Sequence, residues 1–319
     1  MTMKTHKFSN GDEMPALGLG TWKSKPGEVY KAVREAIKIG YRHIDCAYIY
    51  MNEAEIGEAL SDAFKAGDVK REELWITSKL WNSSHLEKDV RPALEKTLQD
   101  LQLDYLDLYL VHWPVALKPG VAFPESEKDF VSLKEIPISE TWKAMEKCAA
   151  DGLTQHIGVS NFSIKKIKDL LEVCEIRPEV NQIELQPFLA QNDMLQFCNK
   201  ESIVLTAYSP LGSTDRPAQF KSPDEPTLLE NPTILEIANA VGCSPAQVLI
   251  RWAIQRGTSV IPKSVNPARL KQNYEAALMQ LRDEDMKKIA ALDRHERIIK
   301  GGFWHAPELG YTLESLWDE

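Results

Sequence analysis

The sequence predicts an α/β fold, a closed (β/α)8 TIM barrel of parallel strands. Strand-like apolar segments alternate with helix-like segments along most of the 319 residues, and polar residues stand at the ends of nearly all these strands. The alternative is a doubly wound sheet. In the segment nearest to its dinucleotide fingerprint, residues 18–23, Lys23 replaces the third glycine, so we favour the barrel.

The first helix is predicted by the spacing of its apolar residues. Between residues 29 and 40 they recur as on one face of an α-helix. They are Val29, Ala32, Val33, Ala36 and Ile37. The segments on either side, residues 18–22 and 41–47, are predicted to be the first two strands.

The same alternation continues through the chain. The next helix has the apolar face Ile56, Ala59, Leu60, Ala63 and Phe64. Ser84 and Glu87 have the spacing of a capping box, which predicts a helix start there. Further helices are predicted at residues 138–147, from 163 and at 194–200. The remaining strands are predicted at residues 74–80, 105–113, 156–161, 180–185, 203–209 and 258–264. Eight strands with crossovers of one hand close into a barrel.

The segments outside this alternation are expected at the two ends of the barrel. Residues 7–14 contain an Asn-Gly turn between short extended pieces, which predicts an N-terminal hairpin that closes the barrel bottom. Long connections at 113–137 and 212–231, and the tail after Asp293, are expected to cover one rim. Because no linker interrupts the alternation, we expect a single domain over residues 1–319.

The composition narrows the classes of partner. A net charge of −9 opposes general attraction to nucleic acid or to an anionic membrane. No apolar run reaches the roughly 18 residues of a membrane span, and the first residues lack the features of a signal peptide. The five cysteines are scattered and the seven histidines have no metal-like pairing. We therefore expect a cytoplasmic monomer with reduced, buried thiols, no metal site and a small-molecule substrate.

Polar residues gather where the predicted strands end. In such barrels the carboxyl ends of the strands form the active site. The residues in question are Asp45, Lys79, His112, Ser160, Asn161, Tyr208 and Lys263, with Gln182 inside the sixth strand. Each of these residues also has an alternative explanation when it is considered alone. Asp45 could cap a turn, and Lys79 could be a solvated residue at a strand end. His112 and Tyr208 could be core residues. Together they predict one shared site.

The motifs that carry these residues resemble those of a known family. They are GYRHIDCAYIYMNE, ITSKLW, LVHWP, GVSNF, NQIELQP, AYSPLGS and IPKS, in this order, within about four fifths of the chain. The chain resembles the aldo-keto reductases, and most closely their aldehyde reductase and aldose reductase branch. The resemblance implies NADPH-dependent reduction of aldehydes, with aldoses and some ketones as further substrates, and a catalytic tetrad of Asp45, Tyr50, Lys79 and His112.

Carbonyl reduction explains this choice of residue types. The carbonyl oxygen needs a proton, and a phenol with a pKa near 10 needs about 4 kcal/mol of tuning to donate it at neutral pH. An ammonium about 4 Å away supplies roughly that amount at an effective dielectric constant near 20. We therefore expect Lys79 to lower the pKa of Tyr50, the proton donor, while Asp45 keeps Lys79 charged and His112 orients the carbonyl.

The resemblance also implies the contacts of the cofactor. Tyr208 would stack on the nicotinamide ring, and Ser160, Asn161 and Gln182 would hold its carboxamide. Gln272 and Asn273 match positions that contact adenine. The further implied cofactor contacts are Thr21, Trp22, Asp45, Ser209, Leu211, Ser213 and Val265, together with Asp215, which would pair with Lys263 as a latch.

The cofactor preference is predicted from one helix start. Lys263, Ser264 and Arg269 lie beside a helix that Asn266 caps and Pro267 opens. Clustered cations at a helix start suit a 2′-phosphate, so NADPH is favoured and NADH, although possible, is disfavoured. The alternative for this segment is an ordinary solvated helix start.

The resemblance implies an aromatic substrate pocket made of Trp22, Trp81, Trp113 and Phe123 around Tyr50 and His112. The tail after Asp293 does not align with the family residue by residue, and we expect Trp304 of this tail to enter the pocket. The alternative for these aromatic residues is simple packing at the rim. Ala218 and Gln219 lie where aldose reductases commonly carry a tryptophan.

Two alternative functions remain open at this point. The protein could be a Schiff-base aldolase that acts through Lys79, or an NADPH-binding regulatory subunit without turnover.

Overall fold

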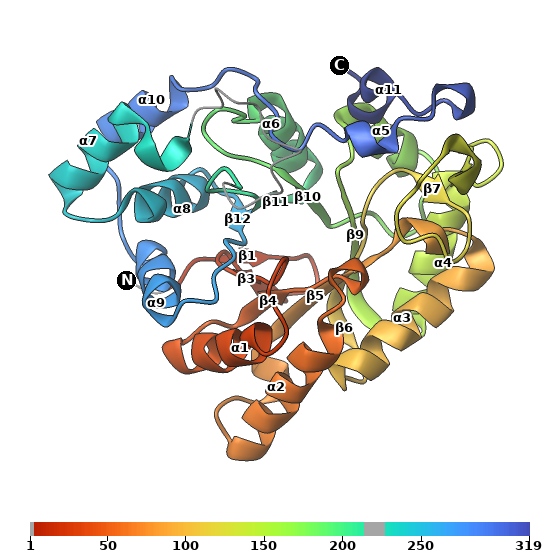
Figure 1. Ribbon diagram of the computed structural model, residues 1–319, viewed down its shortest axis with the longest axis horizontal. Helices are drawn as coiled ribbons and strands as arrows, with labels where there is room; N and C mark the ends of the chain where they lie inside the picture. The colour runs from red at the N-terminus through yellow and green to blue at the C-terminus, as the bar shows by residue number, and fades with distance from the viewer. Residues whose placement is uncertain (1–2, 214–226) are drawn as a thin grey trace.

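The computed structural model describes residues 3–213 and 227–319, and it is a (β/α)8 barrel with helices around a central parallel sheet (Figure 1). The barrel strands are β3 (Leu19–Gly20), β4 (His43–Asp45), β5 (Trp75–Leu80), β6 (Leu106–Val111), β9 (Thr154–Ser160), β10 (Val180–Glu184), β11 (Val204–Tyr208) and β12 (Ser259–Val260). Neighbouring strands pair in chain order and parallel. Parallel bridges from Leu17 to Val260 and from Gly20 to Lys263 close the sheet.

The helices lie around the outside of the sheet (Figure 1). They are α1 (Glu28–Ile39), α2 (Glu53–Ala66), α3 (Glu87–Leu101), α4 (Ile138–Ala150), α5 (Ile164–Leu171), α6 (Asn192–Glu201), α7 (Pro232–Val241), α8 (Pro245–Gln255), α9 (Pro267–Ala276), α10 (Asp283–Ala290) and α11 (Leu313–Trp317). In α1 all five predicted apolar residues are buried, and Val29, Val33 and Ile37 each contribute about 1.5–3 kcal/mol if fully removed from water. Gly40 ends this helix with φ 121°, a conformation that other residues rarely adopt.

Short 3-10 turns connect several of these elements. They are η1 (Tyr48–Tyr50), η2 (Arg71–Glu73), η3 (Asn82–Ser84), η4 (Glu127–Asp129), η6 (Leu228–Glu230), η7 (Gly302–Trp304) and η8 (Pro307–Leu309). The turn η3 makes one sequence prediction wrong. Ser84 does not cap a helix, because the chain first forms this turn and α3 begins three residues later, after Leu86, with no side-chain cap.

The predicted N-terminal hairpin is present. Strands β1 (Thr5–Lys7) and β2 (Glu13–Pro15) pair antiparallel on either side of the Asn-Gly turn. Phe8 and Met14 of this hairpin are buried against the first residues of the barrel strands, including Trp75 and Val180. The hairpin therefore closes the amino-terminal end of the barrel and leaves the carboxyl end for the site.

The carboxyl rim carries a second apolar cluster, which we call the rim cluster. It joins the connection after β6 to the C-terminal tail, and its members are Trp81, Trp113, Val115, Leu117, Phe130, Trp304, Ala306, Tyr311, Leu316 and Trp317. The connection forms a small antiparallel pair, β7 (Ala116–Leu117) with β8 (Phe130–Val131). Tyr311 ties the tail to this pair, donating from Oη to the carbonyl of Val131 at 2.8 Å.

The thiols differ in exposure. Cys46, Cys148 and Cys198 are buried, as predicted, whereas Cys174 and Cys243 are partly exposed, and all five are free.

Within the described chain no single helix is long and apolar enough to cross a membrane. The bent pair of α7 and α8, which meet at 91°, passes that test of length and composition only when the two are taken together.

Candidate active site

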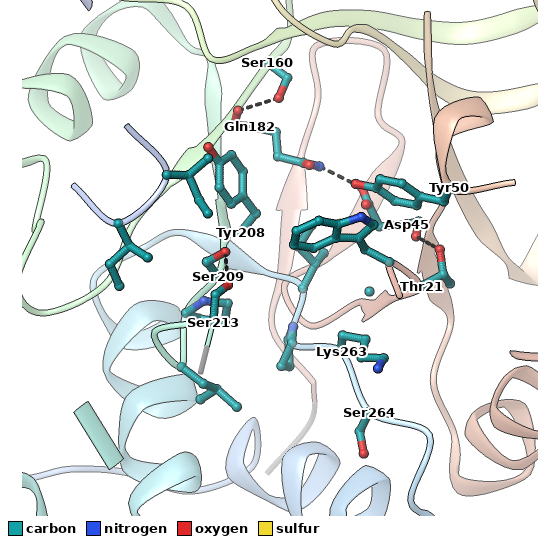
Figure 2. Close-up of a pocket in the computed structure, with 18 of the residues that line it drawn as sticks. Thr21, Asp45, Tyr50, Ser160, Gln182, Tyr208, Ser209, Ser213, Lys263 and Ser264 are labelled. Carbon is teal, nitrogen blue, oxygen red and sulfur yellow. Dashed lines mark hydrogen bonds between the residues drawn. The ribbon is translucent and has the colours of Figure 1, made fainter. Parts of the chain in front are cut away.

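One cavity of about 1380 Å³ opens at the carboxyl ends of the barrel strands. Ligand sites usually measure about 300–1000 Å³, so this cavity has room for two ligands side by side. Its lining includes residues at or near the carboxyl ends of all eight barrel strands. Figure 2 shows several of them, among them Asp45, Tyr208 and Lys263. Of the predicted site residues, Lys79 and Trp304 do not line it, and Asp215 lies outside the described residues, as do Ala218 and Gln219.

Lys79 lies beneath the floor of the cavity and is paired with Asp45. Its Nζ donates to Oδ1 of Asp45 at 2.5 Å and to the carbonyl of Cys46 at 2.8 Å, and the lysine has no exposed surface. Burial alone lowers the pKa of Lys79, but the charge of Asp45, followed by the nearby phenol of Tyr50, raises it above its ordinary value. The ammonium is therefore charged at neutral pH.

Tyr50 ends the turn η1, which follows β4 by two residues. The turn carries the phenol ring back over the strand end, with the ring centre 5.1 Å from Nζ of Lys79. Asn52 holds the segment that follows, donating to the carbonyl of Thr21 at 2.9 Å. Burial raises the pKa of Tyr50 above its ordinary value of 10.0, and the charge of Lys79 offsets only part of that rise.

This direction corrects one sequence expectation. We expected Lys79 to bring the pKa of Tyr50 below that of a free phenol. The charge of Lys79 does act in that direction, but the removal of the phenol from water is the larger effect in this structure. Tyr50 is consequently a neutral phenol throughout the physiological pH range.

His112 faces Tyr50 across the cavity floor. The two ring centres are 6.0 Å apart, and the ring of Trp81 packs against the imidazole at 5.1 Å. Burial, and then the charge of Lys79, lowers the pKa of His112 well below its ordinary value. The imidazole is therefore neutral and offers one N–H donor and one acceptor nitrogen.

A second group of polar residues lies on the side of the cavity formed by β9, β10 and β11 (Figure 2). Oη of Tyr208 donates to Oδ1 of Asn161 at 2.7 Å, and Oγ of Ser160 donates to the carbonyl of Gln182 at 2.8 Å. Nε2 of Gln182 also donates to Oδ2 of Asp45 at 2.7 Å. This bond joins the second group to the pair of Asp45 and Lys79.

The far end of the cavity lies at the start of α9. Asn266 caps this helix as predicted, accepting from the backbone N–H of Arg269 at 3.1 Å. Lys263 donates to the carbonyl of Lys23 at 3.1 Å, and Arg269 is exposed. The other predicted cofactor residues that line this part of the cavity are Ser209, Leu211, Ser213, Ser264, Val265, Gln272 and Asn273.

Aromatic side chains surround the end of the cavity that holds Tyr50 and His112. Trp22, Trp81, Trp113 and Phe123 all line it, as predicted. Trp304 does not, so that prediction is wrong. It is 1% exposed because it packs inside the rim cluster, with its ring 5.7 Å from that of Trp81, and its neighbour Phe303 lines the cavity instead.

The comparisons with known proteins agree with this geometry. The profile described as "Aldo/keto reductase family" matches residues 16–294. An aldo/keto reductase of Synechocystis sp. is 58% identical over 318 residues, which are 100% of this chain and 97% of that protein. The human aldo-keto reductase family 1 member A1 is 50% identical over 291 residues, or 91% of this chain and 89% of that protein.

A solved structure, the aldose reductase from Schistosoma japonicum, superimposes with a TM-score of 0.86. It is 42% identical, and the match covers 94% of this chain and 96% of that chain. The chain belongs to the aldo-keto reductase family.

Aldo-keto reductases are oxidoreductases that depend on a nicotinamide cofactor, and the cavity of this aldo-keto reductase fits such a group. The flat ring of Tyr208 lies beside the amides of Asn161 and Gln182, and a helix N-terminus with nearby cations lies at the other end. Asn161 has a left-handed backbone, φ 63°, a conformation that asparagine tolerates better than most residues and that is typical of functional sites. In the described part of the chain no cluster of three acidic, histidine or cysteine residues could hold a metal.

Several lining residues of this aldo-keto reductase were missed from the sequence. Ile49 precedes Tyr50, and Ile299 and Phe303 belong to the tail, for which no motif was available. Ser244 lines the far end and caps α8 in a capping box with Gln247. That pair was a readable signal, because the spacing of a serine and a glutamine marks a helix start.

Proposed function

We propose that this aldo-keto reductase reduces aldehydes, and also aldoses and some ketones, to alcohols with NADPH. The observation that carries the proposal is the group of Asp45, Lys79, Tyr50 and His112 at the floor of one large cavity. Aldehydes come first because an aromatic wall next to a few polar atoms suits an apolar molecule with one carbonyl. The similarity to the aldose reductase from Schistosoma japonicum supports aldoses as further substrates.

Tyr50 supplies the proton to the carbonyl oxygen. Its raised pKa means that the phenol holds this proton at neutral pH. The charge of Lys79 stabilises the phenolate that is left after transfer, and Asp45 keeps the ammonium charged and in place. The three side chains therefore act as one unit.

His112 orients the substrate. As a neutral imidazole it can direct one N–H to the carbonyl oxygen without competing with Tyr50 as the acid. The aromatic side chains of Trp22, Trp113 and Phe123 bury the rest of the aldehyde. Both interactions restrict which face of the carbonyl is reduced.

NADPH supplies the hydride when it is bound. In this chain Tyr208 would stack on its nicotinamide, and Ser160, Asn161 and Gln182 would hold the carboxamide. Lys263, Ser264 and Arg269 would bind the 2′-phosphate beside the N-terminus of α9, where the helix dipole also favours an anion. This contact is the reason to prefer NADPH over NADH.

The state of Lys79 argues against the aldolase alternative. A Schiff base requires a neutral amine, whereas the ammonium of Lys79 is held charged by Asp45 at 2.5 Å. The regulatory-subunit alternative is disfavoured by the complete set of proton-transfer residues, which cofactor binding alone does not need.

The test is a panel of aldehydes, aldoses and ketones assayed for oxidation of NADPH and of NADH. We expect turnover with aldehydes and NADPH. Tight NADPH binding with no oxidation by any member of the panel would support the regulatory subunit, and trapping of a substrate on Lys79 by borohydride would support the aldolase.

We also propose that the protein acts as one domain and as a monomer, in the cytoplasm. The four catalytic residues all come from one barrel, so the site needs no second copy. Size-exclusion chromatography checks the monomer: the active species should elute at the size of a single chain, with a specific activity that does not change on dilution.

A further inference from the structure

Glu184, the last residue of β10, is a buried carboxylate that the proposed chemistry does not use. It has no exposed surface. Its Oε1 accepts the backbone N–H of Ile298 at 2.8 Å, and its Oε2 accepts that of Ile299 at 2.7 Å. One side chain of the barrel thus fixes two consecutive backbone groups of the C-terminal tail.

The position of Glu184 joins the two sides of the cavity. In the parallel register of the sheet it lies opposite Tyr208, the residue proposed to stack on nicotinamide. The tail residues that it holds, together with the segment up to Phe303, line the cavity. Any movement of this carboxylate would therefore change the distance between the cofactor side and the substrate wall.

The wall segment is held at both ends. On the barrel side, Nε2 of Gln186 donates to the carbonyl of Glu296 at 3.2 Å, next to the two bonds of Glu184. On the far side, Nε1 of Trp317, a member of the rim cluster, donates to the carbonyl of Lys300 at 2.8 Å. Phe303 follows Lys300 closely, so its position depends on these anchors.

A charged group in this place is costly unless the structure compensates it. Burial raises the pKa of Glu184, and the N–H groups of Ile299 and Ile298 are the largest influences that oppose this. The carboxylate is satisfied by these two amides and by Nε2 of Gln186 at 3.3 Å. The two bonds to the tail amides are the side chain's strongest interactions. Removing the charge of Glu184 would therefore weaken these two bonds most.

We propose that Glu184 is a positioning residue that holds the wall formed by Ile299 and Phe303 against the reacting centre, and thereby sets how well bulky aldehydes are reduced. This inference rests on the proposed function. It predicts that loss of the clamp harms substrates that reach the wall and spares small ones that do not.

The test compares Glu184→Gln with a matched control, Glu146→Gln. Glu146 on α4 is also a buried carboxylate that accepts two consecutive backbone N–H groups, those of Glu175 at 2.7 Å and Ile176 at 2.8 Å, both at Oε1, but the two residues that it holds do not line the cavity. In Glu184→Gln the amide turns a donor toward one backbone N–H, so one bond is replaced by repulsion.

For Glu184→Gln we expect kcat/KM for 4-nitrobenzaldehyde to fall about tenfold or more relative to kcat/KM for propanal. The fall should come mainly from a higher KM, because the loss of a charge-assisted bond loosens the wall that the bulky aldehyde reaches. NADPH binding should change less than twofold. Hydrogen exchange should speed up at residues 298–303. Because the glutamine oxygen can still accept both N–H groups, Glu146→Gln, which removes a buried charge elsewhere, should leave the substrate ratio and the exchange at residues 298–303 unchanged.

Equal losses for both aldehydes, the same change in the control, or unchanged exchange at residues 298–303 would overturn the inference. A wild-type protein that reduces no aldehyde would instead overturn the proposed function, and the exchange measurement would still report on the clamp. If Glu184→Gln does not fold, Glu184→Asp, which keeps the charge on a shorter side chain, carries the same test.

Discussion

Lys79 has no exposed surface and yet carries a charge. An isolated ammonium in a protein interior is very unfavourable, so its two oxygen partners, Asp45 and the carbonyl of Cys46, are needed to keep it ionised. Gln182 satisfies the second oxygen of Asp45. This local network provides a fixed positive charge beneath the phenol of Tyr50.

The first prediction at this scale concerns the proton. Tyr50→Phe keeps the ring and removes the donor, so turnover should fall by roughly 10²–10⁴ while NADPH binding survives. Lys79→Met should also reduce turnover. Since the two residues act on one proton, steady-state kinetics should show a double variant that is scarcely worse than the worse single variant. Additive losses would mean that they have separate roles.

The second prediction concerns pH. Only the protonated phenol can donate, and because burial raises the pKa of Tyr50 above 10.0, carbonyl reduction should stay level from neutral pH to about pH 10 and decline only above it. The charge of Lys79 lowers this pKa, so in Lys79→Met any alkaline decline of the rate should shift to higher pH. A decline between pH 7 and 9 in the kcat profile, absent in Tyr50→Phe, would contradict this direction.

At the scale of elements, the spacing of Asp45 and Tyr50 follows from a short turn. Strand β4 ends at Asp45, and η1 brings Tyr50 back over the strand end toward Lys79 of the neighbouring strand β5. A spacing of five residues therefore suffices to place both a carboxylate and a phenol close to one ammonium. A helix in place of this turn would carry Tyr50 away from the rim.

The prediction for elements concerns the start of α9. Lys263→Ala or Arg269→Ala should raise the KM for NADPH much more than that for NADH, since only NADPH has a 2′-phosphate to meet these cations. Initial rates with each cofactor at a saturating aldehyde concentration measure the effect. Equal increases for both cofactors would reject the phosphate role. Lys271→Ala, which changes an exposed cation of the same helix that does not line the cavity, is the control.

At the scale of the whole molecule, the barrel provides the chemistry and the long segments provide the walls. The rim cluster packs the tail against the connection after β6, and Figure 1 shows α11 of that tail beside α5. Lys166 of α5 forms an ion pair with Asp318 at 2.5 Å, which fixes the tail at its far end. The substrate pocket is consequently built from parts that are distant in sequence.

The prediction at this scale concerns stability. Glu53 is buried beside Ser78 and Thr97, and burial raises its pKa from 4.5 to about 7. The folded state thus holds this proton more tightly than the unfolded state, so its contribution to stability falls as pH rises from 4.5 to 7 and is constant above. The free energy of unfolding of Glu53→Gln, measured with urea and compared with that of wild type, should therefore rise by up to about 3 kcal/mol between pH 4.5 and pH 7. This figure uses about 1.4 kcal/mol per pKa unit. A difference that does not vary with pH would contradict this.

Sequence by itself determined the class of fold and the positions of the proposed catalytic residues. Both depend on local patterns: the apolar face of α1, the polar residues that end the strands, and Asn266 at the start of α9 are each set by a few neighbouring residues. The rule that strands of a barrel end at one rim then brings Asp45, Lys79 and His112 together without further information.

Only the tertiary structure decided the balance of electrostatics and the walls of the pocket. The pKa of Tyr50 depends on how much water the whole rim excludes, which no local pattern reveals, and so the expected direction was wrong. Trp304 and Phe303 are neighbours in the tail, and which of them enters the cavity is set by packing in the rim cluster. The clamp of Glu184 on Ile298 and Ile299 joins segments more than a hundred residues apart, a contact that exists only because the chain has folded.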